Sequence, residues 1–338
     1  MSDRTANCSR RAFTGGLTLA GAAGMLGWHA GPVAAEPPPE TTTIRLTKEP
    51  YTCLSPQYVA EDLLRAEGFR EIRYVDVTDG TCTLKVAAGE ADMVMDFAGM
   101  IMTRIDAGDP VVILAGIHIG CIELFATAGI KKLRDFKGKT MAVLALGAPE
   151  HVFLSTMAAY VGLDPRRDIK WATHPADESM RLFAEGKVDG YLAVQPEPQE
   201  LRAKKIGHVV VNTATDRPWS DYFCCMLVAN RGFVRKHPVA TKRALRAILK
   251  AADLCAAEPE RVARIVTDKG FTARFDYTLQ ALKQLSYTPW RRYDPEDTLR
   301  FYGLRLHEAR MIKSSPQTVI ARGTDWRFLS ELKKELKG

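Results

Sequence analysis

Residues 137–160 read KGKTMAVLALGAPEHVFLSTMAAY, and this stretch predicts a strand, a glycine turn and a helix in direct succession. Residues 140–144 are mostly apolar and follow a polar turn, which is typical of a buried strand. Gly147 ends the strand region, and Pro149 favours the first turn of a helix that we expect to end at Tyr160. The stretch therefore predicts one unit of an α/β fold.

The same alternation of strands and helices extends from this unit in both directions. The other expected strands are 43–48, 72–77, 91–97, 111–117, 168–173, 190–194, 208–212 and 223–229. The expected helices are 55–66, one that ends at 88, one through 101–105, 177–184, 196–203, 239–256, 259–267, 277–285, 295–308 and 326–336. This order predicts two similar α/β units, each with a mostly parallel sheet flanked by helices, and then a helical tail.

The first 35 residues have the order of an export signal. Residues 9–13 read SRRAF, a basic run with paired arginines; residues 14–27 are weakly apolar; and VAA at 33–35 supplies small residues before Glu36. This order predicts a twin-arginine signal and a mature protein in the bacterial periplasm. The alternative is an uncleaved membrane anchor, but the apolar run is shorter than the about 20 residues that span a bilayer.

The charge of the chain is moderately basic. The net charge is +7 for the full sequence, and removal of residues 1–35 leaves 44 basic against 39 acidic residues, or +5. Lys242, Arg246 and Lys250 fall on one helix face without interleaved aromatic residues, so we expect no nucleic-acid partner. The sequence also lacks GxSxG, a Walker loop and a GxGxxG after a strand, so no enzyme is predicted.

Three segments of the chain resemble a known family. They are LRDFKGK at 133–139 with the strand and glycine turn that follow, VGLDPRRDIKW at 161–171, and ADESMRLFAEGKVDGYLAVQPEPQELR at 176–202. These segments are similar to those of periplasmic solute-binding proteins of the nitrate, sulfonate and taurine ABC-transporter family. The resemblance covers about residues 43–240 well, and it specifies the family rather than the ligand.

The resemblance implies a two-lobe type II periplasmic binding protein fold of the α/β class. We expect 36–120 and 224–338 to form the first lobe, with the helical tail, and 121–223 to form the second. In that family the protein is a monomer that closes on a small molecule and delivers it to an inner-membrane ABC permease with its ATPase. The resemblance therefore implies a binding protein and no enzyme.

The ligand implied by the resemblance is a nitrate-, sulfonate- or taurine-like anion or zwitterion. The first alternative is a planar pyrimidine of the thiamin-precursor kind, whose binding proteins share the fold. The second alternative is an enzyme of pyrimidine synthesis that consumes its own histidine, as some relatives of the fold do. The export signal argues against this enzyme, because its chemistry belongs in the cytoplasm.

We expect the ligand-binding residues at the carboxyl ends of the strands, where α/β sheets bind ligands. The helix that begins near Gly147 can hold an anion at its N-terminus, although Pro149 removes one N–H group and Glu150 competes for the position. Ser55 doubles as a helix cap. The expected ligand-binding residues are Tyr51, Ser55, Phe97, His118, Cys121, Gly147, His151, Glu197 and Tyr222. We expect Tyr51, His118 and His151 to line one pocket, and no residue is expected to be catalytic.

Six cysteines remain after Cys8 leaves with the signal, and they allow up to three disulfides. They are Cys53, Cys82, Cys121, Cys224, Cys225 and Cys255. Cys255 lies on an apolar helix face and is predicted to be a buried thiol. The cysteines near the cleft, together with His118 and His151, form a group that a soft metal would accept. No CxxC or HxxxH spacing supports such a site, so we expect disulfides or buried thiols and predict no metal and no cofactor.

Overall fold

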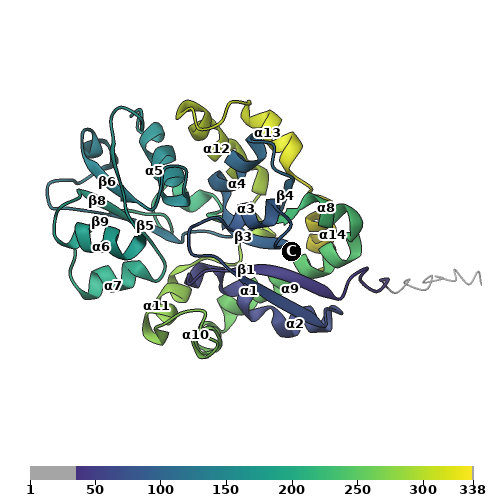
Figure 1. Cartoon of the computed structure of the whole chain (residues 1–338). Helices are drawn as coiled ribbons and strands as arrows, with labels where there is room; N and C mark the ends of the chain where they lie inside the picture. The colour runs from purple at the N-terminus through teal and green to yellow at the C-terminus, as the bar shows by residue number, and fades with distance from the viewer. Residues whose placement is uncertain (1–35, 337–338) are drawn as a thin grey trace, which may run out of the picture. The chain divides into compact units, whose positions relative to one another are not determined.

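The computed structural model describes residues 36–336, and the predicted signal at 1–35 lies outside the described residues. The described chain forms two five-stranded sheets with helices packed on them (Figure 1). No helix among these residues combines the length and the apolar content needed to cross a membrane.

The first sheet has the strand order β2-β1-β3-β10-β4. Its strands are β1 (Thr43–Lys48), β2 (Glu71–Asp76), β3 (Met93–Phe97), β4 (Val111–His118) and β10 (Cys225–Asn230). Strand β1 is parallel to β2 and β3, whereas β10 is antiparallel to β3 and β4 on either side of it. Four of the five strands therefore share one direction.

The second sheet repeats this plan with the order β7-β6-β8-β5-β9. Its strands are β5 (Ile122–Ala126), β6 (Thr140–Val143), β7 (Lys170–Thr173), β8 (Gly190–Val194) and β9 (His208–Asn212). Strand β6 is parallel to β7 and β8, and β5 is antiparallel to β8 and β9. The reversed strands β5 and β10 are the ones that the chain forms just after it crosses from one sheet to the other.

Helices and short 3-10 turns connect the strands and make up the C-terminal part of the described chain. They are η1 (Thr52–Leu54), α1 (Ser55–Val59), α2 (Glu61–Ala66), α3 (Cys82–Ala87), α4 (Ala98–Asp106), η2 (Leu133–Phe136), α5 (Pro149–Tyr160), α6 (Ala176–Ala184), α7 (Glu197–Ala203), η3 (Trp219–Asp221), α8 (Arg231–Lys236), α9 (Pro238–Ala257), α10 (Pro259–Asp268), α11 (Phe275–Gln284), η4 (Pro289–Arg291), α12 (Pro295–Glu308), α13 (Pro316–Gly323) and α14 (Arg327–Glu335).

The C-terminal helices cover the first sheet and also reach the second. Helix α9 packs on α1, α2 and β4, and α13 and α14 both contact β4. Ile113 of β4 forms a bridge with Thr324, so this edge strand is covered and all eight of its residues are buried. Helix α12 contacts α4 beside the first sheet and α5 beside the second, and Figure 1 shows α12 next to both.

One difference from the expected elements matters for the site. Strand β5 was not predicted, because its five buried residues continue the long apolar run of β4 with few turn residues between them. The break is at Gly120, whose φ is 75°, and a Cβ there would lie 2.4 Å from the Cα of Ala214. Only glycine fits this turn, and it sends the chain from one sheet to the other.

Smaller differences concern the helices. Helices α8 and α13 were not predicted, and the helix expected at 55–66 is divided into α1 and α2 at Ala60. Strand β10 begins at Cys225 rather than at residue 223. The bounds of β1, α5 and α12 match the expectations.

Candidate functional site

A cavity of about 380 Å³ lies where the carboxyl ends of strands from both sheets face each other. From the first sheet, its lining includes Glu49 after β1 and Met95 to Phe97 at the end of β3. From the second sheet, it includes Leu144 after β6 and Val194 at the end of β8. Ligands bind in this position in open α/β sheets, and the volume suits a small molecule.

Buried contacts hold the loop after β1 against the cavity. The backbone N–H of Glu49 donates to the hydroxyl of Tyr58 at 3.0 Å, and that hydroxyl donates to the carbonyl oxygen of Glu49 at 2.6 Å. The N–H of Thr52 donates to the carbonyl oxygen of Gln195 at 3.0 Å, which joins this loop to the one after β8. The Ser55 hydroxyl donates to the carbonyl of Thr52 at 2.6 Å and is fully buried. These bonds fix the position of Tyr51 in the cavity wall.

Carboxyl groups dominate the polar lining of the cavity. Burial and the nearby Asp96 carboxylate raise the pKa of Glu49 to about 8. Burial raises the pKa of Asp96 to about 6, although it accepts hydrogen bonds from the Thr83 hydroxyl and, at 2.7 Å, from the N–H of Phe97. Burial also raises the pKa of Glu150 at the start of α5. These three side chains share one cavity, so the ionisation of each disfavours that of its neighbours.

Glu197 lies beside this group, around a smaller void that it shares with Tyr51 and Glu150. Burial raises the pKa of Glu197 to about 7, even though its carboxylate accepts a 2.9 Å hydrogen bond from the N–H of Val194. The pKa of Tyr51 lies well above its usual value, first because of burial and then because of the carboxylates of Glu197 and Glu150. The phenol of Tyr51 therefore stays protonated and is available as a hydrogen-bond donor.

Among the described residues that line the 380 Å³ cavity there is no lysine, arginine or histidine. A ligand anion there would meet no charged donor from these described residues, while Glu49, Asp96, Glu150 and Asp177 line the same space. The apolar part of the lining includes Phe97, which adds a ring surface. The electrostatics of the cavity favour a ligand with N–H donors or positive charge over a simple anion.

One side of the cavity carries sulfur. Cys53, Cys121 and Cys225 line it, and Cys121 forms a disulfide with Cys224. Cys53 and Cys225 are free, buried thiols, as is Cys255 in α9, in agreement with the prediction for Cys255. The Cys225 thiol, followed by the neighbouring His118, lowers the pKa of Cys53, while the same contact with Cys53 raises the pKa of Cys225.

The expected ligand-binding residues divide into two groups. Tyr51, Phe97 and Cys121 line the cavity, and Glu197 adjoins it. Ser55 turns its hydroxyl into its own loop, and His118 is fully buried behind the cavity with its ring 5.4 Å from that of Tyr287.

The other expected residues lie outside the lining. The N–H of Gly147 donates to Nδ1 of His151 at 3.0 Å, and the His151 ring packs 4.6 Å from Trp171. Tyr222 stacks on Phe301 at 4.2 Å in an aromatic group at α12. Of Tyr51, His118 and His151, which were expected to line one pocket, Tyr51 lines the 380 Å³ cavity, whereas His118 is buried behind it and His151 has local partners.

Sequence reasoning did not select several residues that line the cavity. Glu49, Asp96 and Glu150 are not among the expected ligand-binding residues, although all three line the cavity. Their position at the carboxyl ends of β1 and β3 and at the start of α5 was the available signal. Cys53 and Cys225 were expected near the cleft but not as ligand-binding residues, and both line the cavity.

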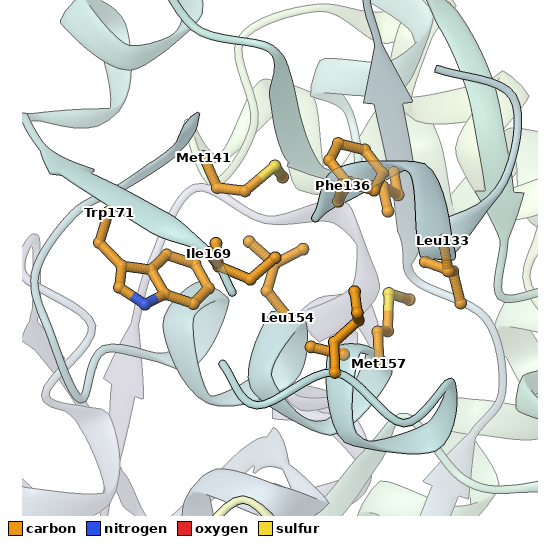
Figure 2. Close-up of a pocket in the computed structure, with 10 residues that line it drawn as sticks. Leu133, Phe136, Met141, Leu154, Met157, Ile169 and Trp171 are labelled. Carbon is orange, nitrogen blue, oxygen red and sulfur yellow. The ribbon is translucent and has the colours of Figure 1, made fainter. Parts of the chain in front are cut away.

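A second, much smaller pocket of about 20 Å³ lies beside the second sheet. Figure 2 shows apolar side chains, among them Phe136, Met141, Leu154 and Trp171, gathered around it. Its volume is close to the space that one water molecule needs, and apolar spaces of this kind stay dry. It therefore belongs to the core of the second sheet rather than to a ligand site.

A sequence model of the NMT1-like family matches residues 38–267. The nitrate/nitrite binding protein NrtA of Nostoc sp. (strain PCC 7120) is 24% identical to the chain over 169 residues. That match covers 49% of this chain and 38% of the relative, so the chain spans about two fifths of the length of that protein.

Solved structures share the whole arrangement. The periplasmic nitrate-binding protein NrtA from Synechocystis PCC 6803 aligns with a TM-score of 0.74 at 15% identity, covering 89% of this chain and 90% of its own. The alkanesulfonate-binding protein SsuA from Xanthomonas axonopodis pv. citri, bound to MOPS, aligns with a TM-score of 0.68 at 16% identity, covering 87% and 100%. The two-lobe periplasmic binding protein fold expected from the sequence is confirmed by these likenesses together with the two sheets.

Proposed function

The chain belongs to the NMT1-like family, and we propose that it is the periplasmic substrate-binding component of an ABC importer. The observation that carries this proposal is the 380 Å³ cavity between the facing carboxyl ends of two sheets. A cavity of this size and place suits capture of one small molecule. The nitrate-binding and alkanesulfonate-binding proteins that share the fold support the same role.

The ligand that we propose carries N–H donors or a positive charge beside a planar or apolar part. Support comes from Glu49, Asp96 and Glu150, in a lining to which the described part of the chain contributes no basic side chain. An ammonium or aminopyrimidine-like group would pair with these carboxyls, whereas nitrate or a sulfonate would be repelled by any that are ionised. Tyr51 and Phe97 supply ring surfaces for a planar group. These side chains favour a planar nitrogen heterocycle or a zwitterion over a bare anion.

The ligand contacts that we propose are Tyr51, Phe97, Cys121 and Glu197. The first three line the cavity, and the fourth lines the smaller void that shares Tyr51 and Glu150 with it. We propose no ligand contact for Gly147, His151 and Tyr222, because each has its own local contacts.

The division of the chain is part of the proposal. Residues 36–120 and 224–338 form the first lobe, and 121–223 form the second. The chain passes from the first sheet to the second at the turn after β4 and returns in the segment before β10. These two crossings support the limits of the lobes. Closure of the lobes on the ligand would then be a hinge motion about the two crossings.

Export and partners complete the proposal. The twin-arginine signal at 1–35 would direct the folded protein to the periplasm, where it acts as a monomer and delivers its ligand to an inner-membrane permease with an ATPase. The permease would recognise the closed, ligand-bound form better than the open one.

A thermal-shift screen of the protein without residues 1–35 tests the ligand class. The panel contains aminopyrimidines, amines, taurine, alkanesulfonates and nitrate, and each hit is measured by calorimetry. Ligand at about 100 times its Kd stabilises by roughly 2.7 kcal/mol. We expect the nitrogen-containing compounds to bind; tighter binding of nitrate or of an alkanesulfonate would contradict the proposed class, and no hit at all would contradict a binding protein for these compounds.

Matched variants assign the binding to the cavity. Asp96→Asn removes a carboxylate from the lining, whereas Asp268→Asn changes an exposed carboxylate at the end of α10. We expect the first variant to weaken binding of a cationic ligand about tenfold or more, and the second to leave the Kd unchanged. Equal affinity of both variants would place the binding site elsewhere.

A long incubation with the ligand separates a binding protein from the alternative enzyme. A binding protein should return the ligand unchanged, whereas the enzyme would alter it.

A further inference from the structure

Four side chains from three segments place sulfur and nitrogen donors together beside the cavity. They are Cys53 in η1, His118 at the end of β4, Cys121 in the crossing after it, and Cys225 at the start of β10. One donor atom from each lies within 4.8 Å of every other, and all four residues are buried. The antiparallel register of β10 and β4 sets Cys225 directly opposite His118, so two of the donors sit on rigid neighbouring strands.

His118 is the unexplained member of this group. Its exposed fraction is 0%, and neither Nδ1 nor Nε2 has a hydrogen-bond partner of acceptable geometry among the described residues. A buried imidazole with both nitrogens unpaired loses the hydrogen bonds that it made to water, at a cost of about 1–3 kcal/mol. Its ring is held from the side by Tyr287, whose ring centroid lies 5.4 Å away at an angle of 63°. A lone pair of His118 is therefore held in place and unused.

The disulfide divides the sulfur atoms into two kinds. Cys121 is bonded to Cys224 and has no thiolate to offer, while Cys53 and Cys225 are free thiols. Two thiols and one imidazole are the donors that soft and borderline ions select, and Zn(II) and Cu(I) are the usual ones. We propose that Cys53, His118 and Cys225 bind one thiophilic metal ion at the base of the cavity. On binding, the two thiols release their protons to solvent and the disulfide stays intact.

The dimensions of the group suit one ion. Sulfur ligands lie about 2.3 Å and imidazole nitrogens about 2.0–2.1 Å from Zn(II), so the donors of one ion lie about 3.5–4 Å apart. The donor atoms here are all within 4.8 Å of one another, which small side-chain movements would close. Cys53 and Cys225 also line the cavity, so a further coordination position would face it. A water molecule or a donor atom of the captured compound would occupy that position.

Metal titration of the metal-free protein without residues 1–35, disulfide intact, tests the proposal. Zn(II) and Cu(I) are titrated separately against a chromophoric chelator, and Co(II) serves as a spectroscopic probe. We expect one equivalent of Zn(II) or Cu(I), and thiolate-to-cobalt charge-transfer absorption. X-ray absorption of the wild-type zinc or copper form should show two sulfur ligands and at least one nitrogen. This measurement uses the wild-type protein, so it tests the proposal even if a variant fails to fold.

Matched alanine variants identify the ligands. Cys53→Ala and Cys225→Ala should each weaken metal binding more than about 100-fold. Loss of a residue that only hydrogen-bonds to a metal ligand already lowers metal affinity by about 10–100-fold. Cys255→Ala is the control, since Cys255 is an equally buried free thiol outside the group. If none of Zn(II), Cu(I) and Co(II) bound stoichiometrically, the proposal would be overturned. Binding that survives in the Cys53 and Cys225 variants, or that needs prior reduction of the disulfide, would overturn it as well.

Discussion

The backbone N–H of Thr52 donates a 3.0 Å hydrogen bond to the carbonyl oxygen of Gln195, and this bond joins the first sheet to the second at the cavity wall. Each residue is next to one that lines the cavity, Tyr51 and Cys53 on one side and Val194 on the other. A movement that separated the two sheets here would have to break this bond. The lining on this side is therefore assembled by contact between two loops that are far apart in the sequence.

The buried carboxyls predict that the ligand-free protein loses stability as the pH rises. The folded-state pKa of Glu49 is about 8, against 4.5 for the exposed group, so the folded protein binds more protons than the unfolded chain between these values. The free energy of unfolding must fall across that range, and one pKa unit corresponds to about 1.4 kcal/mol. Asp96 and Glu197, with values of about 6 and 7, act in the same direction. Denaturant unfolding at pH 5 and pH 8 measures the difference.

Glu49→Gln is the variant that isolates this effect. It keeps the shape of the side chain and removes the titration, so the difference in unfolding free energy between pH 5 and pH 8 should shrink by at least about 1.4 kcal/mol. The control is Asp268→Asn, which changes an exposed carboxylate and should leave the pH dependence as in the wild type. An unchanged pH dependence in Glu49→Gln would show that Glu49 titrates normally.

Ligand binding should show the opposite pH dependence. A cationic amine needs ionised carboxylates, and Asp96, Glu197 and Glu49 ionise in turn near pH 6, 7 and 8. The affinity for an amine from the thermal-shift panel should therefore rise between pH 5.5 and pH 8.5, with uptake of the ligand accompanied by proton release. Calorimetry in two buffers of different ionisation enthalpy measures both quantities. Affinity for an amine that falls as the pH rises would contradict the role of these carboxyls.

Removal of one ring from the cavity wall should weaken binding without unfolding the protein. Tyr51→Ala should raise the Kd of the compound selected by the screen about tenfold or more, which corresponds to a loss of about 1.4 kcal/mol or more. Tyr222→Ala is the matched control, because Tyr222 stacks on Phe301 outside the cavity lining. Calorimetric titration of both variants should separate them; a larger effect of Tyr222→Ala would move the site toward α12.

Phe153 should be among the costliest side chains to truncate. It is fully buried on α5, with its ring centroid 4.4 Å from Phe97 of β3 and 5.8 Å from Tyr302 of α12. Phe153→Ala should lower the unfolding free energy by about 3–5 kcal/mol, because the space that it leaves lies between elements of both sheets. Leu304→Ala on the exposed side of α12 should change it by less than about 0.5 kcal/mol. Denaturant unfolding compares the two variants.

Export should depend on the paired arginines. Replacement of Arg10 and Arg11 by lysine should leave the full-length precursor in the cytoplasm, because twin-arginine export requires the arginine pair. Cell fractionation followed by immunoblotting measures the distribution, with Arg4→Lys as the control in the same basic region. Normal periplasmic delivery of the double variant would contradict the twin-arginine prediction.

Local sequence patterns were enough to predict the class of fold. The bounds of β1 and α5 follow from apolar periodicity and from turn residues such as Gly147 and Pro149, all of which act within a few residues. The same patterns failed at β5, because an apolar run that continues through Gly120 carries no local mark of a change of sheet. They also failed for α8 and α13.

What the sequence determined by itself was the succession of α/β units and the family, since both depend on residues that are close together along the chain. Only the tertiary structure decided which of the candidate residues meet at the site and which lie outside it. Cys53, His118 and Cys225 meet because β4 and β10 pair and η1 packs against them, although long stretches of chain separate all three. The raised pKa values of Glu49 and Asp96 likewise arise from burial by residues of distant segments. Burial and convergence are properties of the packed chain, and no local pattern of residues encodes them.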